Sequence, residues 1–119
     1  DGDAVNACLF PAAALDGREL LTIEGLAAKD GSLDAVQRAF IDYNGPQCGF
    51  CTPGQLMAAT ALLESNPRPT AQEVRAGMAG NLCRCSNYNA IVEAVLAAAG
   101  TLEAAGGVGG SGSTNGGGR

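Results

Sequence analysis

Apolar residues recur at helical spacing from residue 32 onward, and turn residues divide this stretch into segments. The pattern predicts four helices, over about residues 32–43, 52–65, 70–80 and 88–99. Clusters of Asn, Gly and Pro follow the first two segments, where they are typical of helix ends. The sequence therefore predicts a mainly α-helical domain.

Capping signals indicate where three of these helices begin. Ser32 is the expected N-cap of the first helix. Thr52 is expected to cap the second, because Pro53 and then a Gln three residues after the cap follow it. Thr70 and Glu73 form a second capping box at the start of the third helix.

The second and fourth segments are the most apolar. Residues 56–63 are apolar on nearly every side, so we expect this helix to be central and buried. The last segment has the clearest amphipathic stripe, formed by Tyr88, Ile91, Val92, Val95, Leu96 and Ala99. Each half of the region reads helix, cysteine loop, helix. We therefore predict a four-helix bundle with approximate two-fold symmetry and with both cysteine loops at one end.

The remaining parts of the chain differ in character. Residues 1–27 suggest two short strands, Val5–Leu9 and Leu20–Ile23, with a turn at Asp16-Gly17. Two short strands do not fold alone, so this segment is predicted to be the end of a β-rich domain. Residues 28–100 form the predicted helical domain, and residues 101–119 a flexible, Gly-rich tail.

Charge and hydropathy exclude several classes of protein. The net charge is −5, and the seven basic residues are scattered, so no nucleic-acid footprint is expected. No apolar stretch is long enough to insert into a membrane. The N-terminus lacks the regions of a secretory signal. We therefore expect a cytoplasmic protein, or a periplasmic one if a signal precedes this chain.

Four cysteines carry the candidate chemistry. Cys48 and Cys51 form one pair, Cys83 and Cys85 another, each shortly before a predicted helix, and the chain has no histidine. Four thiolates can ligate a [2Fe–2S] cluster, and helix N-termini favour the thiolate form. Structural zinc commonly uses pairs with two intervening residues, a wider spacing than that of Cys83 and Cys85. Zinc and disulfides stay open on spacing alone, as do two roles for Arg84: offsetting cluster charge or pairing with a surface carboxylate.

Two motifs resemble one family closely. Residues 47–54 (QCGFCTPG) and 80–85 (GNLCRC) resemble the iron–sulfur subunit or domain of the molybdenum hydroxylases, the family of xanthine dehydrogenase, aldehyde oxidoreductase and carbon monoxide dehydrogenase. Residues 8–12 (CLFPA) and 22–26 (TIEGL) also look like that family. The resemblance implies that a plant-ferredoxin-like domain precedes the helical one, so that residues 1–27 are its C-terminal remnant.

The resemblance also implies site residues. Cys48, Cys51, Cys83 and Cys85 would hold a [2Fe–2S] cluster, and Gln47 and Cys85 would face molybdopterin on a partner. Cys8 fits the fourth ligand of a second cluster, but the Cys-x4-Cys-x2-Cys loop that supplies the other ligands is absent from the sequence. The simplest explanation is a sequence that begins partway through the subunit; the alternatives are a truncated gene product and a partner that supplies the missing part. We therefore expect that this chain cannot assemble that cluster alone.

One departure from the family concerns the second motif. The family commonly continues it with Thr-Gly-Tyr, whereas this chain has Ser86-Asn87-Tyr88. Ser86 keeps the hydroxyl, and Asn87 tolerates the left-handed backbone that Gly often supplies, so little disruption is expected.

By this resemblance, the chain is an electron-transfer subunit of a molybdopterin-dependent hydroxylase. It would relay electrons from molybdenum on a large partner subunit, through its cluster, to a further acceptor. A flavin subunit carrying FAD and a cytochrome are the two acceptors considered. The chain itself offers no catalytic residues. The alternatives are a zinc- or disulfide-stapled helical interaction module without redox activity, and an independent soluble ferredoxin-like electron carrier.

Overall fold

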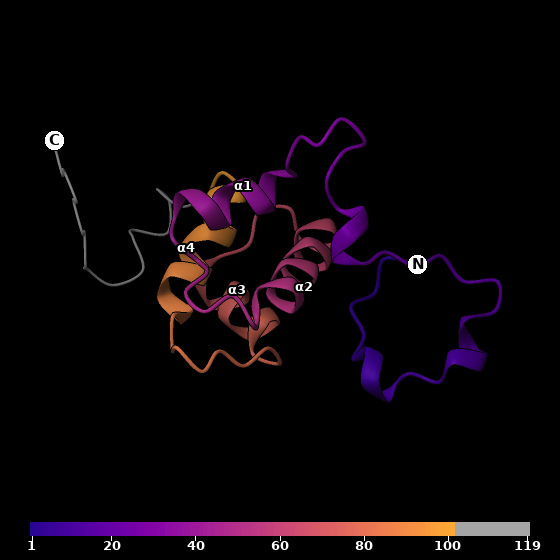
Figure 1. The fold of residues 1–119 in the computed structure, drawn as a ribbon. Coiled ribbons are helices and arrows are strands. Elements are labelled where there is room, and N and C mark those ends of the chain that lie inside the picture. Colours follow the sequence, from indigo (N-terminus) through magenta and orange to yellow (C-terminus); the bar gives the residue numbers. More distant parts are fainter. Residues whose placement is uncertain (102–119) are drawn as a thin grey trace, which may run out of the picture.

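The computed structural model describes residues 1–101, and in this range the protein is helical, with no β-strand. A mainly α fold with four α-helices is thereby confirmed. The helices are α1 (Ala35–Asp42), α2 (Thr52–Ser65), α3 (Ala71–Met78) and α4 (Tyr88–Ala98) (Figure 1). The predicted tail falls almost wholly on residues 102–119, which lie outside the described residues.

The capping signals locate the helix starts to within two residues. Thr70 and Glu73 form the predicted capping box of α3. The prediction for α1 was wrong by two residues: its N-cap is Asp34, in a capping box with Gln37. Ser32 instead donates from its backbone N–H and its hydroxyl to the Asp30 carboxylate. The N-cap position of α1 is therefore taken by Asp34, which forms a reciprocal capping box, and not by the upstream hydroxyl of Ser32.

The start of α2 also differs by one position. Cys51 occupies the N-cap position, and Thr52 is already helical and makes no capping bond. The Thr52 N–H donates to the carbonyl of Gly49, so the preceding turn continues directly into the helix. The last residue of the first cysteine motif is therefore fixed by the first turn of α2.

The core is centred on α4, where this helix meets α1 and α3, and not on α2 as predicted. α1 and α3 both pack on α4, while α2 packs on α3 and touches α1. α4 buries five residues, namely Ile91, Val92, Ala94, Val95 and Leu96, whereas the longer α2 buries only Gln55, Leu56 and Ala59. The other apolar residues in the middle of α2 are only half-buried, namely Met57, Ala58, Ala61, Leu62 and Leu63. No helix within residues 1–101 is both long and apolar enough to cross a membrane.

The two predicted strands are not present. Short 3-10 helices replace them: η1 (Ala7–Leu9), η2 (Ala12–Leu15) and η3 (Ile23–Gly25). Residues 1–9 are all exposed, and this segment extends to one side of the bundle (Figure 1). Without a neighbouring strand to complete a hydrogen-bonded ladder, alternating apolar residues have no sheet to join. Of the three short helices, η3 packs on the bundle, against α2, and residues 2–4 line a shallow hollow with the same helix.

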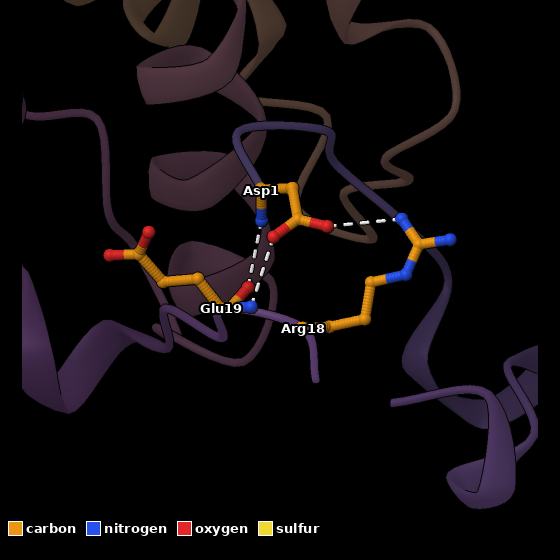
Figure 2. A network of polar contacts seen from close by, with 3 residues as sticks. All are labelled: Asp1, Arg18 and Glu19. Carbon is orange, nitrogen blue, oxygen red and sulfur yellow. Dashed lines mark hydrogen bonds and ion pairs between the residues drawn. The ribbon is translucent and has the colours of Figure 1, made fainter. Parts of the chain in front are cut away.

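Polar contacts close the exposed N-terminal loop on itself. The Asp1 carboxylate accepts from Arg18 at 3.0 Å and from the Glu19 N–H at 2.9 Å (Figure 2). The Asp1 amino group donates to the Glu19 carbonyl at 2.7 Å. All three residues are exposed, so such an ion pair contributes at most about 1 kcal/mol.

Candidate metal centre

The two cysteine loops meet at one end of the bundle, as predicted. The first connects α1 to α2 and the second connects α3 to α4, so each loop precedes a helix N-terminus. Together they line one hollow, formed by Cys48, Phe50, Cys51, Leu82, Cys83, Arg84 and Tyr88. Residues separated by more than thirty positions in the chain are thereby brought into one site.

The four thiols interact as two pairs, each with one member from each loop. Cys48 lies against Cys85, and Cys51 lies against Cys83, close enough for each thiol to shift the pKa of its partner. None of the five cysteines is in a disulfide. In residues 1–101, no three His, Cys, Asp or Glu side chains gather in a way that would hold a single metal ion.

Backbone N–H donors lower the pKa of two of the thiols, those of Cys48 and Cys83. The N–H of Phe50 lowers the pKa of Cys48, and the Cys85 thiol lowers it further. The N–H of Asn87 lowers the pKa of Cys83, against the effect of burial. The N–H groups at and just before the start of α4 therefore face a sulfur atom, which is the favourable position for an anion.

The other two thiols have raised pKa values. Burial raises the pKa of Cys51, and the neighbouring Cys83 adds to this effect. For Cys85, the N–H of Cys48 lowers the pKa, but the Cys48 thiol, burial and the nearby thiolate charges together outweigh it. Each pair thus combines one thiol that ionises readily with one that ionises reluctantly. A cationic centre between them would favour ionisation of all four.

Left-handed backbone shapes both loops. Gly49 has φ +83°, and a Cβ atom there would meet nothing within 4 Å. Glycine is therefore suited to this position by its left-handed backbone, and not by a need to leave room for a neighbouring atom. In the second loop Ser86 has φ +57°, whereas Asn87 has φ −82°. The tolerance of Asn87 for left-handed backbone is therefore not used. Ser86 takes the left-handed turn, which leaves the Asn87 side chain available for another purpose.

Three polar side chains join the loops to their surroundings, and sequence reasoning missed all three. The Asn87 Nδ2 donates to the carbonyls of both Asn44 and Gly45 at 2.8 Å. The Gln55 Nε2 donates to the Asn81 carbonyl at 2.9 Å. The Tyr88 hydroxyl accepts from the Cys83 N–H at 2.8 Å. The partners of Asn87 and Gln55 are backbone atoms distant in sequence, for which a single sequence carries no signal, whereas the partner of Tyr88 lies five residues away.

The rim of the hollow is exposed and partly apolar. Phe50 is 94% exposed and Leu82 is 80% exposed, although both are large apolar side chains. Gln47 is also exposed, next to Cys48. Arg84 lines the hollow, and among residues 1–101 it has no ion pair with a carboxylate.

Cys8 is not part of this centre. It lies in η1, in the exposed N-terminal segment, and its thiol is free. The structure therefore brings together four of the five cysteines.

Comparison with known proteins identifies the family. The model of a family described as "[2Fe-2S] binding domain" matches residues 22–96, which is more than half of the chain and includes all four clustered cysteines. The chain belongs to this [2Fe–2S] binding domain family. Iron–sulfur chemistry is thereby shown, and the zinc- and disulfide-stapled alternatives are not favoured.

The relatives are subunits or domains of molybdenum hydroxylases, as the two motifs predicted. The chain is 54% identical over 102 residues to the nicotine 6-hydroxylase small subunit of Paenarthrobacter nicotinovorans, covering 86% of this chain and 61% of that one. It is 50% identical over 99 residues to the xanthine dehydrogenase iron-sulfur-binding subunit of Escherichia coli O157:H7, covering 81% and 61%. This chain thus spans less than two thirds of the length of these relatives.

Solved structures agree in fold. Quinoline 2-oxidoreductase from Pseudomonas putida 86 matches with a TM-score of 0.78 and 42% identity, over 88% of this chain and 64% of that chain. Aldehyde oxidoreductase from Desulfovibrio gigas matches with a TM-score of 0.79 and 36% identity, over 87% of this chain and 12% of that chain. The helical arrangement is therefore that of proteins with related sequences.

Proposed function

We propose that this chain is the electron-transfer part of a molybdopterin-dependent hydroxylase. The observation that carries the proposal is the pairing of four thiols across two loops, in a chain of the [2Fe–2S] binding domain family. Cys48, Cys51, Cys83 and Cys85 are the proposed ligands. When bound, the cluster supplies one-electron transfer.

The donor set fits such a cluster. Four sulfur ligands satisfy two irons, and the chain offers no histidine that would compete. N–H groups of Phe50 and Asn87 face Cys48 and Cys83, where they stabilise the negative charge that thiolates carry. Arg84, exposed at the rim, adds positive charge nearby.

The exposed rim is the proposed docking face for a large molybdopterin-binding subunit. Gln47 and Cys85 are proposed to face the pterin, since the Gln47 amide offers both a donor and an acceptor and is exposed. Relatives named as small or iron-sulfur-binding subunits support a multi-subunit assembly. A flavin subunit carrying FAD, or a cytochrome, would receive the electrons.

Two finer features of the fold belong to the same proposal. An approximate two-fold axis would exchange α1 with α3 and α2 with α4, and the pairing of α1 with α4 and α3 with α2 is what such an exchange requires. Residues 1–27 are proposed as the end of a ferredoxin-like domain, followed by the helical domain at 28–100. Cys8 would then be a ligand of a second cluster whose other ligands lie outside this sequence.

Metal analysis tests the ligand set. The full chain, reconstituted anaerobically with ferrous iron and sulfide, should bind two irons and two acid-labile sulfides. Replacing any of the four proposed ligands by Ser should reduce this content or alter the visible spectrum, whereas Cys8→Ser should not. Stoichiometric zinc in the purified chain, with no cluster after reconstitution, would overturn the proposal.

The docking face has a separate test. Gln47→Ala should leave the cluster spectrum unchanged, because the side chain is exposed and is not a proposed ligand. In a complex with the large subunit, the variant should slow reduction of the cluster by substrate or weaken pterin retention. Reduction at the wild-type rate with full pterin content would show that Gln47 does not face the cofactor.

A further inference from the structure

We propose that two side-chain amides, those of Gln55 and Asn87, are positioning residues that hold the two cysteine loops at a fixed separation. The inference rests on the proposed ligand set and goes beyond it. It assigns to residues that bind no metal the task of keeping four thiols in register.

Asn87 is placed where an asparagine normally caps a helix, but it does not cap. It occupies the N-cap position of α4 and makes no capping hydrogen bond. Its Nδ2 group instead reaches across the site and donates to the carbonyls of Asn44 and Gly45, both at 2.8 Å. Both amide hydrogens are thus used to join the residue two positions after Cys85 to the segment three to four positions before Cys48.

The segment that receives these bonds is itself rigid. Asn44 has φ +53°, a left-handed conformation that ends α1. Gly45 is buried, and a Cβ atom there would lie 2.9 Å from the ring of Phe40, which is 2% exposed. The Gly45 N–H also donates to the Phe40 carbonyl at 2.8 Å. Asn87 is therefore anchored to the end of α1 and not to a mobile loop.

Gln55 makes the equivalent connection on the other side. It lies four residues after Cys51, and its backbone N–H donates to the Cys51 carbonyl at 3.0 Å. Its side chain is 1% exposed and donates to the carbonyl of Asn81, two residues before Cys83, at 2.9 Å. The entrance of the second loop is thereby joined to the exit of the first.

The Gln55 amide is poorly suited to a purely stabilising role. Its Oε1 is buried without any hydrogen-bond partner among the described residues. An orphaned buried acceptor destabilises the fold and offsets much of what the Nε2 bond contributes. The geometry therefore points to a residue that holds the Asn81 carbonyl in place.

Together the two amides fix both ends of the second cysteine loop against the first. Neither amide bonds a cysteine, so both act on the backbone that carries the thiols and not on the thiols themselves. Groups that orient metal ligands commonly change metal affinity about 10- to 100-fold when they are removed. We expect removal of either amide to affect the cluster more than it affects the fold.

Cluster release tests this. The reconstituted full chain and its Asn87→Ala and Gln55→Leu variants are mixed with an excess of a ferrous chelator after reduction. Iron loss should be about tenfold faster in each variant. The electron paramagnetic resonance signal of the reduced cluster should also broaden, because the ligand geometry becomes heterogeneous. Asn89→Ala and Gln72→Ala are matched controls, since both amides are exposed on helices and make no hydrogen bond among the described residues.

The outcomes separate the two claims. Failure of the wild-type chain to take up a cluster would overturn the proposed ligand set. A wild-type cluster with variants that match the controls in both iron release and resonance signal would overturn the amide proposal alone. If Asn87→Ala does not fold, Asn87→Gly and Gln55→Met provide the same comparison. Glycine is well tolerated at the N-cap position that Asn87 occupies, and methionine keeps about the side-chain volume of Gln55. Wild-type behaviour in these would likewise overturn it.

Discussion

At the scale of single residues, the site depends on backbone conformations that few residues tolerate. Gly49, between the first two thiols, has φ +83°, and Ser86, directly after the second pair, has φ +57°. Ser86 shows that a side chain can be held in this region when the surrounding loop fixes it. Gly49 has no such support, because a Cβ there would contact nothing.

Gly49→Ala should therefore destabilise the first cysteine loop. Left-handed backbone costs a non-glycine residue roughly 1–2 kcal/mol, and no new contact would offset this. The expected result is a lower urea midpoint of the reconstituted chain together with faster cluster loss. Gly31→Ala is the control, because Gly31 has φ +85° and equally open surroundings but lies outside the cysteine loops. It should lower the midpoint without accelerating cluster loss; equal cluster loss in both variants would contradict the prediction.

Gln55 allows stability to be separated from positioning. Gln55→Met removes one hydrogen bond, worth about 1 kcal/mol, but also removes an orphaned acceptor whose burial costs about 1–3 kcal/mol. We expect the free energy of unfolding to be unchanged or slightly raised. Urea denaturation followed by circular dichroism measures this. A loss above about 2 kcal/mol would show that Oε1 has a partner, such as a buried water.

At the scale of elements, the features that depend on neighbouring residues were predicted correctly, whereas those that depend on tertiary contacts were not. The α3 capping box and the α4 stripe are properties of neighbouring residues, so the sequence alone located both helices. Strands at residues 5–9 and 20–23 were predicted from equally local patterns and are absent from the described part of the chain. A strand depends on a partner strand, which local sequence cannot supply. The sequence also placed α2, and not α4, at the centre of the core. This error has a similar cause, because the burial of a helix depends on which other helices pack against it.

The capping box of α3 provides a test at this scale. The Glu73 carboxylate accepts from the Thr70 N–H, which together with the Thr70 hydroxyl lowers the pKa of Glu73 below its ordinary value of 4.5. This contribution is complete above that value and is lost as the pH falls through the lowered pKa. Thr70→Ala should therefore cost about 1 kcal/mol at pH 7, whereas Thr70→Ser should cost much less. Thermal unfolding at pH 7 compares them, and equal losses would show that the hydroxyl does not cap α3.

The core around α4 should respond most strongly to truncation. Leu96 is fully buried, so Leu96→Ala should cost about 2–5 kcal/mol of unfolding free energy. Leu21→Ala is a matched control, because Leu21 is 51% exposed and lies before the bundle. Urea denaturation should show a large shift of the midpoint for Leu96 and a small one for Leu21. Similar shifts would mean that α4 does not form the centre of the core.

At the scale of the whole molecule, the sequence predicted the meeting of the four cysteines but not the side chains that support them. The four cysteines and their meeting at one end followed from spacing and from helix starts. The bonds from Asn87 to Asn44 and from Gln55 to Asn81 span 43 and 26 residues and depend on the folded arrangement of the loops. The two apolar side chains of the rim were not predicted either, since the exposure of Phe50 and Leu82 is known only once the loops are placed.

That rim leads to the last prediction. Phe50 and Leu82 flank the thiols and are 94% and 80% exposed, and large exposed apolar groups beside a functional site are typical of a protein interface. Because neither side chain packs in the core, Phe50→Asp and Leu82→Asp should leave folding and cluster content unchanged. Each should weaken assembly with the proposed molybdopterin-binding subunit by at least about tenfold, the effect expected of a buried interface anchor.

Size-exclusion chromatography and titration of the purified large subunit measure this assembly. Leu20→Asp is the control, because Leu20 is 61% exposed but does not line the hollow that holds the cysteines. It introduces the same charge into a chain that is already acidic, so it accounts for any general electrostatic repulsion. If all three variants assemble equally well, the partner docks elsewhere. If Leu20→Asp alone fails to assemble, the docking face lies on the N-terminal segment, and electrons would leave the centre by a longer route than the exposed rim provides.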